Sequence, residues 1–322
     1  MAVRFGTFAP QGWRMDLVEI ADPVEKFEAM IRVAQAADEG GFDSVWVYDH
    51  FHTVPRPTEN TVFEAWTATA TLARDTQRIN VGQMVTCNGY RNPALWAKIA
   101  STVDVAAHGR LYAGYGAGWY EHEWRSYGYG FPETRDRMRA FREGCEIIHK
   151  MWTEDKPTFK GEYYTIDEPI NEPKGVRKPH PSFWIGGGGE QVTLKLVARY
   201  GDACNLGGPP EQIAHKLDVL KGHCETVGRN YDEIIRSSST NVFLLEAGDD
   251  AESATEKARN AIGASFEDFQ KEFVVGTADK VVAALREKSD VGIDYQLVYL
   301  PRIAYDHGMI QQFTEQVIPQ LG

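Results

Sequence analysis

Short runs of β-forming residues alternate with longer helical patterns along most of the 322-residue chain, and this alternation is the strongest constraint on its fold. The first helix is expected at Asp22 and Pro23, because aspartate caps helix N-termini and proline suits the first helical position. The predicted strands cover residues 4–9, 44–48, 79–86, 110–118, 183–186, 203–206, 239–245 and 295–300. About eight strands separated by helices predict an α/β fold of the (β/α)8 (TIM) barrel type. A doubly wound open sheet is the alternative.

The alternation breaks between residues 154 and 181, where five prolines occur. Residues 163–166 fit a short strand, and the aromatic side chains of this stretch need a place to be buried. We therefore interpret the stretch as an insertion rather than a linker. Since no shift in composition divides the chain, we expect a single domain over residues 1–322 with an insertion at about residues 154–181.

The composition is that of a soluble globular protein, with 43% hydrophobic and 25% charged residues. The net charge of −12 argues against binding to nucleic acid or to an anionic membrane surface. Four widely spread cysteines without a C-x-x-C pair argue against a disulfide framework and against a thiolate zinc site. The N-terminus lacks the apolar run of a signal peptide, and no stretch approaches the ~20 apolar residues of a membrane span. These features predict a protein of the reducing cytoplasm, whereas the charge balance says little about a small-molecule ligand.

The ligand site of a (β/α)8 barrel lies at the C-terminal ends of its strands. Here those ends are rich in glycine and aromatic residues with a few polar groups, which suits a flat aromatic ligand that carries a phosphate. Trp13 stands in the first loop, and a tryptophan in a loop often lines a pocket. Trp119 and Trp124 follow the fourth strand, where they are interpreted either as pocket or as core residues.

Four consecutive glycines, Gly186 to Gly189, follow a predicted strand and precede a helix expected to begin near Glu190. Free backbone N–H groups at a helix start favour an anion, and glycine lets the backbone approach phosphate oxygens. The segment is not a G-x-G-x-x-G fingerprint, because Gln191 stands at the third position, and residues 114–118 fail the pattern too. A phosphate cradle is therefore predicted, and a Rossmann-type NAD site is disfavoured.

His50 stands beside Asp49 at the end of the second predicted strand. A neighbouring carboxylate can hold the tautomer of an imidazole and tune it as a general acid or base. A histidine on a surface loop is the alternative. His50 and His52 also form an H-x-H pair, as metal clamps do, but the other strand ends supply no obvious further ligands, so no metal site is predicted. Glu121 and Glu123 flank His122 after the fourth strand, either as catalytic acids or as the start of a solvated helix, and the solvated helix is favoured for Glu123.

Several segments together carry a family resemblance: residues 41–51 (GFDSVWVYDHF), 78–86 (RINVGQMVT), 91–94 (RNPA), 109–111 (GRL), 116–119 (GAGW), 159–164 (FKGEYY) and 181–189 (PSFWIGGGG). On these segments the chain resembles the bacterial luciferase-like flavin and deazaflavin oxidoreductases. Within them it is similar to the branch that uses coenzyme F420. The segments run in family order from about residue 40 to 208, and the last third of the chain matches only loosely.

The resemblance implies an interrupted (β/α)8 barrel with a deazaflavin, coenzyme F420, or alternatively FMN across the strand ends. His50 becomes the catalytic proton donor or acceptor, and the family has a bulge with a non-proline cis peptide at the place of Met84 and Val85. The implied cofactor-binding residues are Asp49, Met84, Val85, Thr86, Gly116, His122, Gly186, Gly187, Gly188, Gly189, Glu190 and Gln191. The expected substrate pocket consists of Trp13, His52 and Trp119. A homodimer is also expected, as in many members of the family.

One departure from the family bears on the substrate. In the deazaflavin-linked glucose-6-phosphate dehydrogenases a catalytic glutamate directly follows the G-x-G turn, and this chain has Trp119 there. A tryptophan makes the pocket more apolar, so the sequence favours an apolar or aromatic substrate.

Four hypotheses about function result. The leading one is an F420-dependent oxidoreductase that transfers hydride at C5 of the deazaflavin while His50 moves the matching proton. The second is an FMN-dependent two-component monooxygenase of the same fold. A metal-dependent hydrolase built on His50 and His52, and a non-catalytic cofactor carrier, rank well below these two.

Overall fold

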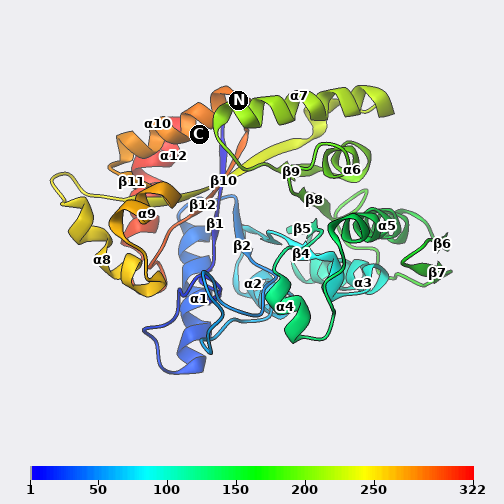
Figure 1. The fold of residues 1–322 in the computed structure, drawn as a ribbon, viewed down its shortest axis with the longest axis horizontal. Coiled ribbons are helices and arrows are strands. Elements are labelled where there is room, and N and C mark those ends of the chain that lie inside the picture. Colours follow the sequence, from blue (N-terminus) through cyan, green and yellow to red (C-terminus); the bar gives the residue numbers. More distant parts are fainter. Residues whose placement is uncertain (1) are drawn as a thin grey trace.

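Parallel strands close into an eight-stranded barrel in the computed structural model, which describes residues 2–322 (Figure 1). The barrel strands are β1 (Arg4–Phe8), β2 (Ser44–Val47), β3 (Asn80–Gln83), β5 (Leu111–Gly116), β8 (Ser182–Gly186), β9 (Ala203–Asn205), β10 (Ile235–Leu244) and β12 (Tyr295–Tyr299). Each strand pairs in parallel with the next in this order, and β12 pairs back with β1. This closure confirms the predicted barrel and excludes the doubly wound open sheet.

Four short strands lie outside the barrel circle. β4 (Thr86–Cys87) pairs with β5, and β11 (Phe273–Gly276) pairs with β10. β6 (Thr158–Lys160) and β7 (Thr165–Asp167) form an antiparallel hairpin within the stretch that the sequence interprets as an insertion. The hairpin projects from the barrel beyond helix α5 (Figure 1).

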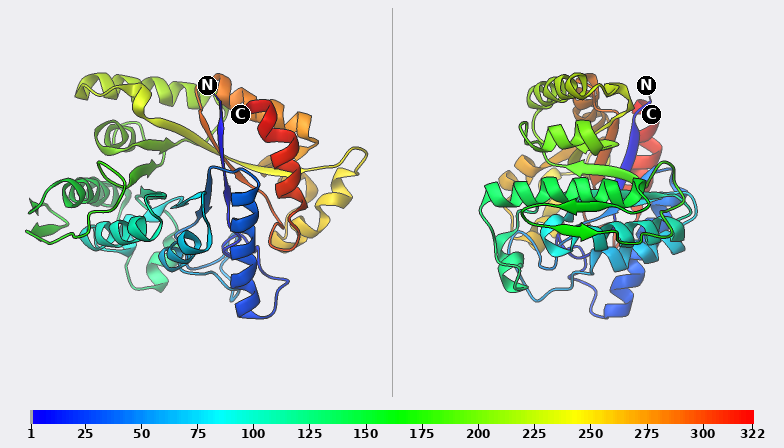
Figure 2. Two further views of the ribbon diagram at one scale, coloured as in Figure 1. Left: turned by 180° about the vertical axis from the view of Figure 1, so that it is seen from behind. Right: turned by 90° about the vertical axis from the view of Figure 1, so that its right-hand side faces the viewer.

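Helices surround the barrel and fill the connections between its strands (Figure 2). They are α1 (Pro23–Glu39), α2 (Ala65–Asp75), α3 (Pro93–Ala106), α4 (Glu121–Ser126), α5 (Thr134–Thr153), α6 (Thr193–Tyr200), α7 (Pro210–Val227), α8 (Ala251–Ile262), α9 (Phe266–Glu272), α10 (Ala278–Asp290), α11 (Gly308–Gln312) and α12 (Ile318–Leu321). As predicted, α1 begins at Asp22 and Pro23: the Asp22 carboxylate accepts the Glu25 N–H at 2.8 Å. Three short helical turns complete the chain: η1 (Asn88–Tyr90), η2 (Tyr231–Glu233) and η3 (Phe313–Val317).

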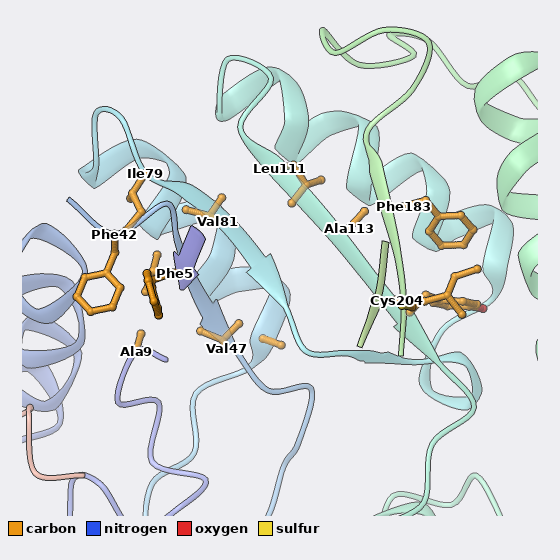
Figure 3. Packing of buried hydrophobic residues seen from close by; sticks show 14 of the residues in the cluster. Phe5, Ala9, Phe42, Val47, Ile79, Val81, Leu111, Ala113, Phe183 and Cys204 are labelled. Atoms are coloured by element: carbon orange, nitrogen blue, oxygen red, sulfur yellow. The ribbon is translucent and has the colours of Figure 1, made fainter. Parts of the chain in front are cut away.

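The main hydrophobic core lies between the strands and the surrounding helices. On β2, Val45 and Val47 join this core, whereas Trp46 between them belongs to a second cluster inside the barrel. This division follows the two-residue period of a strand, whose successive side chains point to opposite faces. Figure 3 shows part of the outer core, in which Val81 and Leu111 continue the same layer on neighbouring strands.

Large aromatic side chains fill the inside of the barrel. Trp46 is fully buried, and its ring centroid lies 4.8 Å from that of Trp184. The adjacent strands carry Gly6 and Gly82, where an added Cβ would approach within 2.7 Å of the Trp46 ring. Because the interior is packed in this way, a ligand has room only at the mouth of the barrel.

The two ends of the described chain lie side by side (Figures 1 and 2), and the Val3 N–H donates to the Leu321 carbonyl at 3.1 Å. Among residues 2–322, no helix has both the length and the apolar character that crossing a bilayer requires.

Candidate active site

A cavity of about 780 Å³ opens at the C-terminal ends of the barrel strands. This volume lies in the range of small-molecule sites, ~300–1,000 Å³. The predicted residues that line it are Trp13, Asp49, His50, Met84, Val85, Gly116, Trp119, Gly186, Gly187, Gly188, Gly189, Glu190 and Gln191. Lining residues that the sequence analysis did not single out include Tyr48, Cys87, Tyr90, Met138 and Asn205. Segments far apart in the sequence therefore meet at one mouth.

Three predicted site residues do not line this cavity. Thr86 is buried and its hydroxyl accepts the indole N–H of Trp66 at 3.1 Å. His52 and His122 lie near the surface, where their Nδ1 atoms are 3.0 Å apart. The structure thus pairs these two histidines with each other instead of directing them to the mouth of the barrel.

A buried carboxylate holds His50. Glu123, on α4, has a fully buried side chain, and its Oε2 lies 2.8 Å from Nδ1 of His50. The same oxygen accepts the hydroxyl of Tyr90 at 2.9 Å, and Oε1 accepts the N–H groups of Phe51 and His52 at 2.7 and 2.8 Å. The expectation that Glu123 begins a solvated helix was wrong, because α4 packs this residue against the loop that follows β2.

Glu123 is ionised at neutral pH. Burial by itself raises the pKa of this carboxyl, but the hydrogen bond and charge of His50 and the two backbone N–H groups more than offset it, so the pKa lies below its ordinary value. An ionised carboxylate only accepts hydrogen bonds, so Nδ1 of His50 carries a proton. The second ring nitrogen, Nε2, is then the one left to exchange a proton at the cavity.

Asp49 does not perform the role that its position in the sequence suggests. Its carboxylate accepts two hydrogen bonds from the Arg91 guanidinium, at 2.7 and 3.0 Å, and one from the Cys87 N–H at 2.8 Å. Burial lowers the pKa of Arg91, but Asp49 and Glu64 raise it by more, so the pKa of its guanidinium lies above the ordinary value. Asp49 therefore ties the end of β2 to the segment after β4, and Glu123 is the carboxylate that orients His50.

Aromatic rings frame His50 on two sides. The ring of Trp13 lies parallel to the imidazole with a centroid distance of 4.4 Å, and the ring of Trp119 meets it edge-on at 5.6 Å. Trp13 also contacts Tyr48 at 4.1 Å, whereas Trp119 is 60% exposed at the rim of the cavity. Trp119 is thus a pocket-edge residue and not a core residue, whereas Trp124 is buried in a small cluster below.

The floor of the cavity requires glycine. The Met84–Val85 peptide bond is cis, as the family resemblance implies, and the Val85 side chain lies between the ends of β5 and β8. A Cβ at Gly116 would come within 2.6 Å of a Val85 methyl carbon, and one at Gly186 within 2.8 Å. Such distances are too short for a side chain at either position, so glycine at both strand ends makes room for Val85.

The glycine cradle has a cation above it. Gly187 has a φ of +116°, which favours glycine, and a Cβ at Gly188 would lie 2.6 Å from Nζ of Lys216 on α7. Helix α6 begins at Thr193, later than the predicted start near Glu190, because residues 190–192 form a turn. Lys216 was missed by the sequence analysis because nothing in an amphipathic helix distinguishes it from other lysines.

The two histidines of the H-x-H pair face different partners, since His50 contacts Glu123 and His52 contacts His122. Within residues 2–322, His, Cys, Asp and Glu side chains form no group of three or more with an arrangement that suits a metal ion.

The model of the luciferase-like monooxygenase family matches residues 3–295. The chain belongs to this family. Among curated relatives, an F420-dependent glucose-6-phosphate dehydrogenase of Amycolatopsis mediterranei (strain U-32) is 27% identical over 91% of this chain and 94% of its own. A protein of the same name from Kineococcus radiotolerans is 28% identical over 89% of this chain and 91% of its own.

Solved structures share the fold of this luciferase-like chain at low identity. An F420-dependent secondary alcohol dehydrogenase in complex with an F420-acetone adduct superimposes with a TM-score of 0.82 at 21% identity, covering 100% of both chains. The monooxygenase RslO1 from Streptomyces bottropensis has a TM-score of 0.82 at 22% identity, and the match covers 99% of this chain and 100% of RslO1. The FMN-bound oxygenating constituent of 3,6-diketocamphane monooxygenase from Pseudomonas putida has a TM-score of 0.78 at 17% identity. The match covers 100% of this chain and 99% of that structure.

Proposed function

We propose that this protein is an F420-dependent oxidoreductase that transfers a hydride between the deazaflavin and a small organic substrate. The observation that carries the proposal is the Glu123–His50 pair at the wall of a glycine-floored, aromatic cavity. The names of the curated relatives, which are F420-dependent dehydrogenases, support the choice of cofactor.

The residues present fit such a group. Gly116 and Gly186, which carry no side chain, line the cavity together with Val85, which packs against both, and this surface suits a planar ring system. We infer that Met84, Val85 and Gly116 contact the ring, and that Gly187 to Gln191 with Lys216 hold the phosphate. We leave Thr86 and His122 out of the proposed cofactor contacts, because neither lines the cavity.

When bound, F420 supplies the two-electron chemistry by giving or accepting a hydride. His50 supplies the proton: Nε2 gives it to, or takes it from, the substrate atom next to the carbon that exchanges the hydride. Glu123 stays ionised throughout and stabilises the imidazolium form of His50 through Nδ1. Trp13 stacks on the imidazole and Trp119 meets it edge-on, so the two rings help to hold the orientation of His50.

The proposed substrate is apolar or aromatic and lacks a phosphate. The described residues that line the cavity include tryptophan and tyrosine side chains but no lysine or arginine, and Lys216 beside the glycine cradle is assigned to the phosphate of the cofactor. A sugar phosphate needs cations at its phosphate group, and Trp119 occupies the position after the Gly116–Gly118 turn. The substrate is therefore expected to differ from the glucose 6-phosphate of the named relatives.

Parallel fluorescence titrations of the purified protein with F420 and with FMN test the cofactor. Micromolar affinity for F420 with much weaker FMN binding is the expected result, and substrate screens for hydride transfer follow. Tighter FMN binding with oxygen consumption would instead support the monooxygenase alternative. Failure to bind either cofactor would overturn the proposal.

A further inference from the structure

A second cavity, of about 810 Å³, lies between α5 and α6 and adjoins the first. The two helices pack side by side at one end of the molecule (Figure 1). Four residues line both cavities: Thr134 and Met138 of α5, and Gln191 and Val192 of the turn before α6. The second cavity, hereafter the α5–α6 groove, is thus continuous with the predicted phosphate cradle.

Basic side chains line both walls of the α5–α6 groove. Arg135, Arg139 and Arg142 occupy positions i, i+4 and i+7 of α5, which share one helix face, and Lys195 and Arg199 occupy i and i+4 of α6. On a chain with a net charge of −12, five basic residues around one groove are a marked local concentration of positive charge. From Arg135 to Arg142 the α5 row extends about 10 Å along the helix axis.

The acidic side chains of the groove neutralise little of this charge. Glu143 is buried and directs its carboxylate to the N–H groups of residues 162, 163 and 164, at 2.8, 2.9 and 3.1 Å. Glu146, half-buried on α5, is the other acidic lining residue. Arg139 lies 3.5 Å from the exposed Glu162, and Arg142 makes no ion pair with any residue of the described chain. Most of the basic groups therefore remain available to an external anion.

We propose that the α5–α6 groove binds the oligoglutamate tail of F420. The inference rests on the proposed function and extends it from the ring and phosphate to the far end of the cofactor. The tail follows the phosphate in the cofactor, and the groove follows the glycine cradle at Gln191 and Val192. Each glutamate adds a carboxylate, the group that guanidinium side chains recognise best. FMN, which ends at its phosphate, gains nothing from the groove.

Fluorescence titration with long-tailed F420 and with the form that lacks glutamates tests the proposal. At low salt the long-tailed form is expected to bind about tenfold more tightly, and this advantage is expected to vanish at high salt, where charges ~10 Å apart are screened. The variant Arg142→Glu/Arg199→Glu should lose the tail advantage and keep its affinity for the tail-less form. Both positions are exposed, and tail-less binding also reports that the variant is folded.

A matched control separates the groove from the overall charge. Lys257→Glu/Lys280→Glu makes the same change in net charge on α8 and α10, far from α5 and α6 in Figure 1, and should keep the tail advantage. Equal binding of both forms by the unmodified protein would overturn the groove proposal and leave the proposed function intact. An advantage that survives in the groove variant, or disappears in the control, would overturn it too. Binding of neither form would overturn both proposals.

Discussion

Replacing Glu123 with glutamine tests the assignment of His50 most directly. All four partners of this carboxylate act as donors: the N–H groups of Phe51 and His52, the hydroxyl of Tyr90 and Nδ1–H of His50. Glutamine has the same shape but only one acceptor oxygen, so its NH₂ group must face two of these donors. If the glutamine oxygen keeps accepting the N–H groups of Phe51 and His52, its NH₂ group faces Nδ1 of His50. Nδ1 must then accept a hydrogen bond, so the ring proton moves to Nε2, and Nε2 can no longer accept a proton from the substrate.

The expected loss follows from the removed charge. The Oε2–Nδ1 distance is 2.8 Å in a fully buried setting, so the carboxylate stabilises the imidazolium that forms when His50 accepts a proton. A hydrogen bond to a charged group contributes about 1.5–3 kcal/mol net, and about 1.4 kcal/mol corresponds to a tenfold change in rate, so kcat is expected to fall about 10- to 150-fold.

The assay follows the absorbance of F420 in single turnovers with a reactive substrate, and a separate titration checks that the variant binds F420 normally. Glu121→Gln on the same helix is the matched control, since Glu121 is exposed and, within residues 2–322, forms an ion pair with Arg125 alone, at 2.7 Å. Its rate should not change. A Glu123→Gln variant that folds, binds F420 and turns over within about threefold of the unmodified rate would refute the role given to this carboxylate.

Four further predictions address other parts of the site. His50→Ala should lower turnover ~10²–10⁴-fold in steady-state assays while F420 affinity stays nearly unchanged; an unchanged turnover would remove His50 from the mechanism. Gly186→Ala should abolish tight F420 binding in titrations, because its Cβ would lie 2.8 Å from a valine methyl carbon, whereas Gly207→Ala, with open space around it, should bind normally. Lys216→Ala should weaken F420 and FMN about tenfold alike, as loss of a phosphate contact predicts, and selective loss of one cofactor would contradict this. The pKa of Glu123 is lower in the folded protein than in the unfolded chain, where it is about 4.3. The ionised carboxylate therefore stabilises the folded state above pH ~4.3, and this stabilisation is lost as the pH falls through the folded pKa. Acid unfolding, followed by circular dichroism, should be less steep in Glu123→Gln.

Local sequence rules were sufficient for much of the barrel. The Asp22–Pro23 start of α1 matches the structure because helix capping depends on neighbours in the chain. The position of the ligand site at the strand ends was also predictable, because the end of a short apolar run indicates where a strand ends. The segment 246–276, which forms α8, α9 and β11, was not predicted in this way.

Strand β10 shows where such rules fail. It begins at Ile235, but the prediction started at residue 239, because Ser237 and Ser238 do not look like residues of a buried strand. Both serines are fully buried, and the segment extends because it pairs with β9 on one side and β12 on the other. Pairing with strands that are distant in the sequence, and not the propensity of the segment, decides its structure.

The same distinction explains why the sequence indicated His50 correctly as a residue of the mouth but chose the wrong carboxylate to hold it. Neighbouring residues at the end of a strand point to opposite sides, so Asp49 was poorly placed to reach the ring of His50. Its carboxylate turns instead to Arg91, and the ring turns to Glu123, 73 residues further along the chain. No spacing rule links these two positions. The contact exists because β2 and β5 end at the same mouth and α4 follows β5 directly, so closure of the barrel itself brings His50 and Glu123 together.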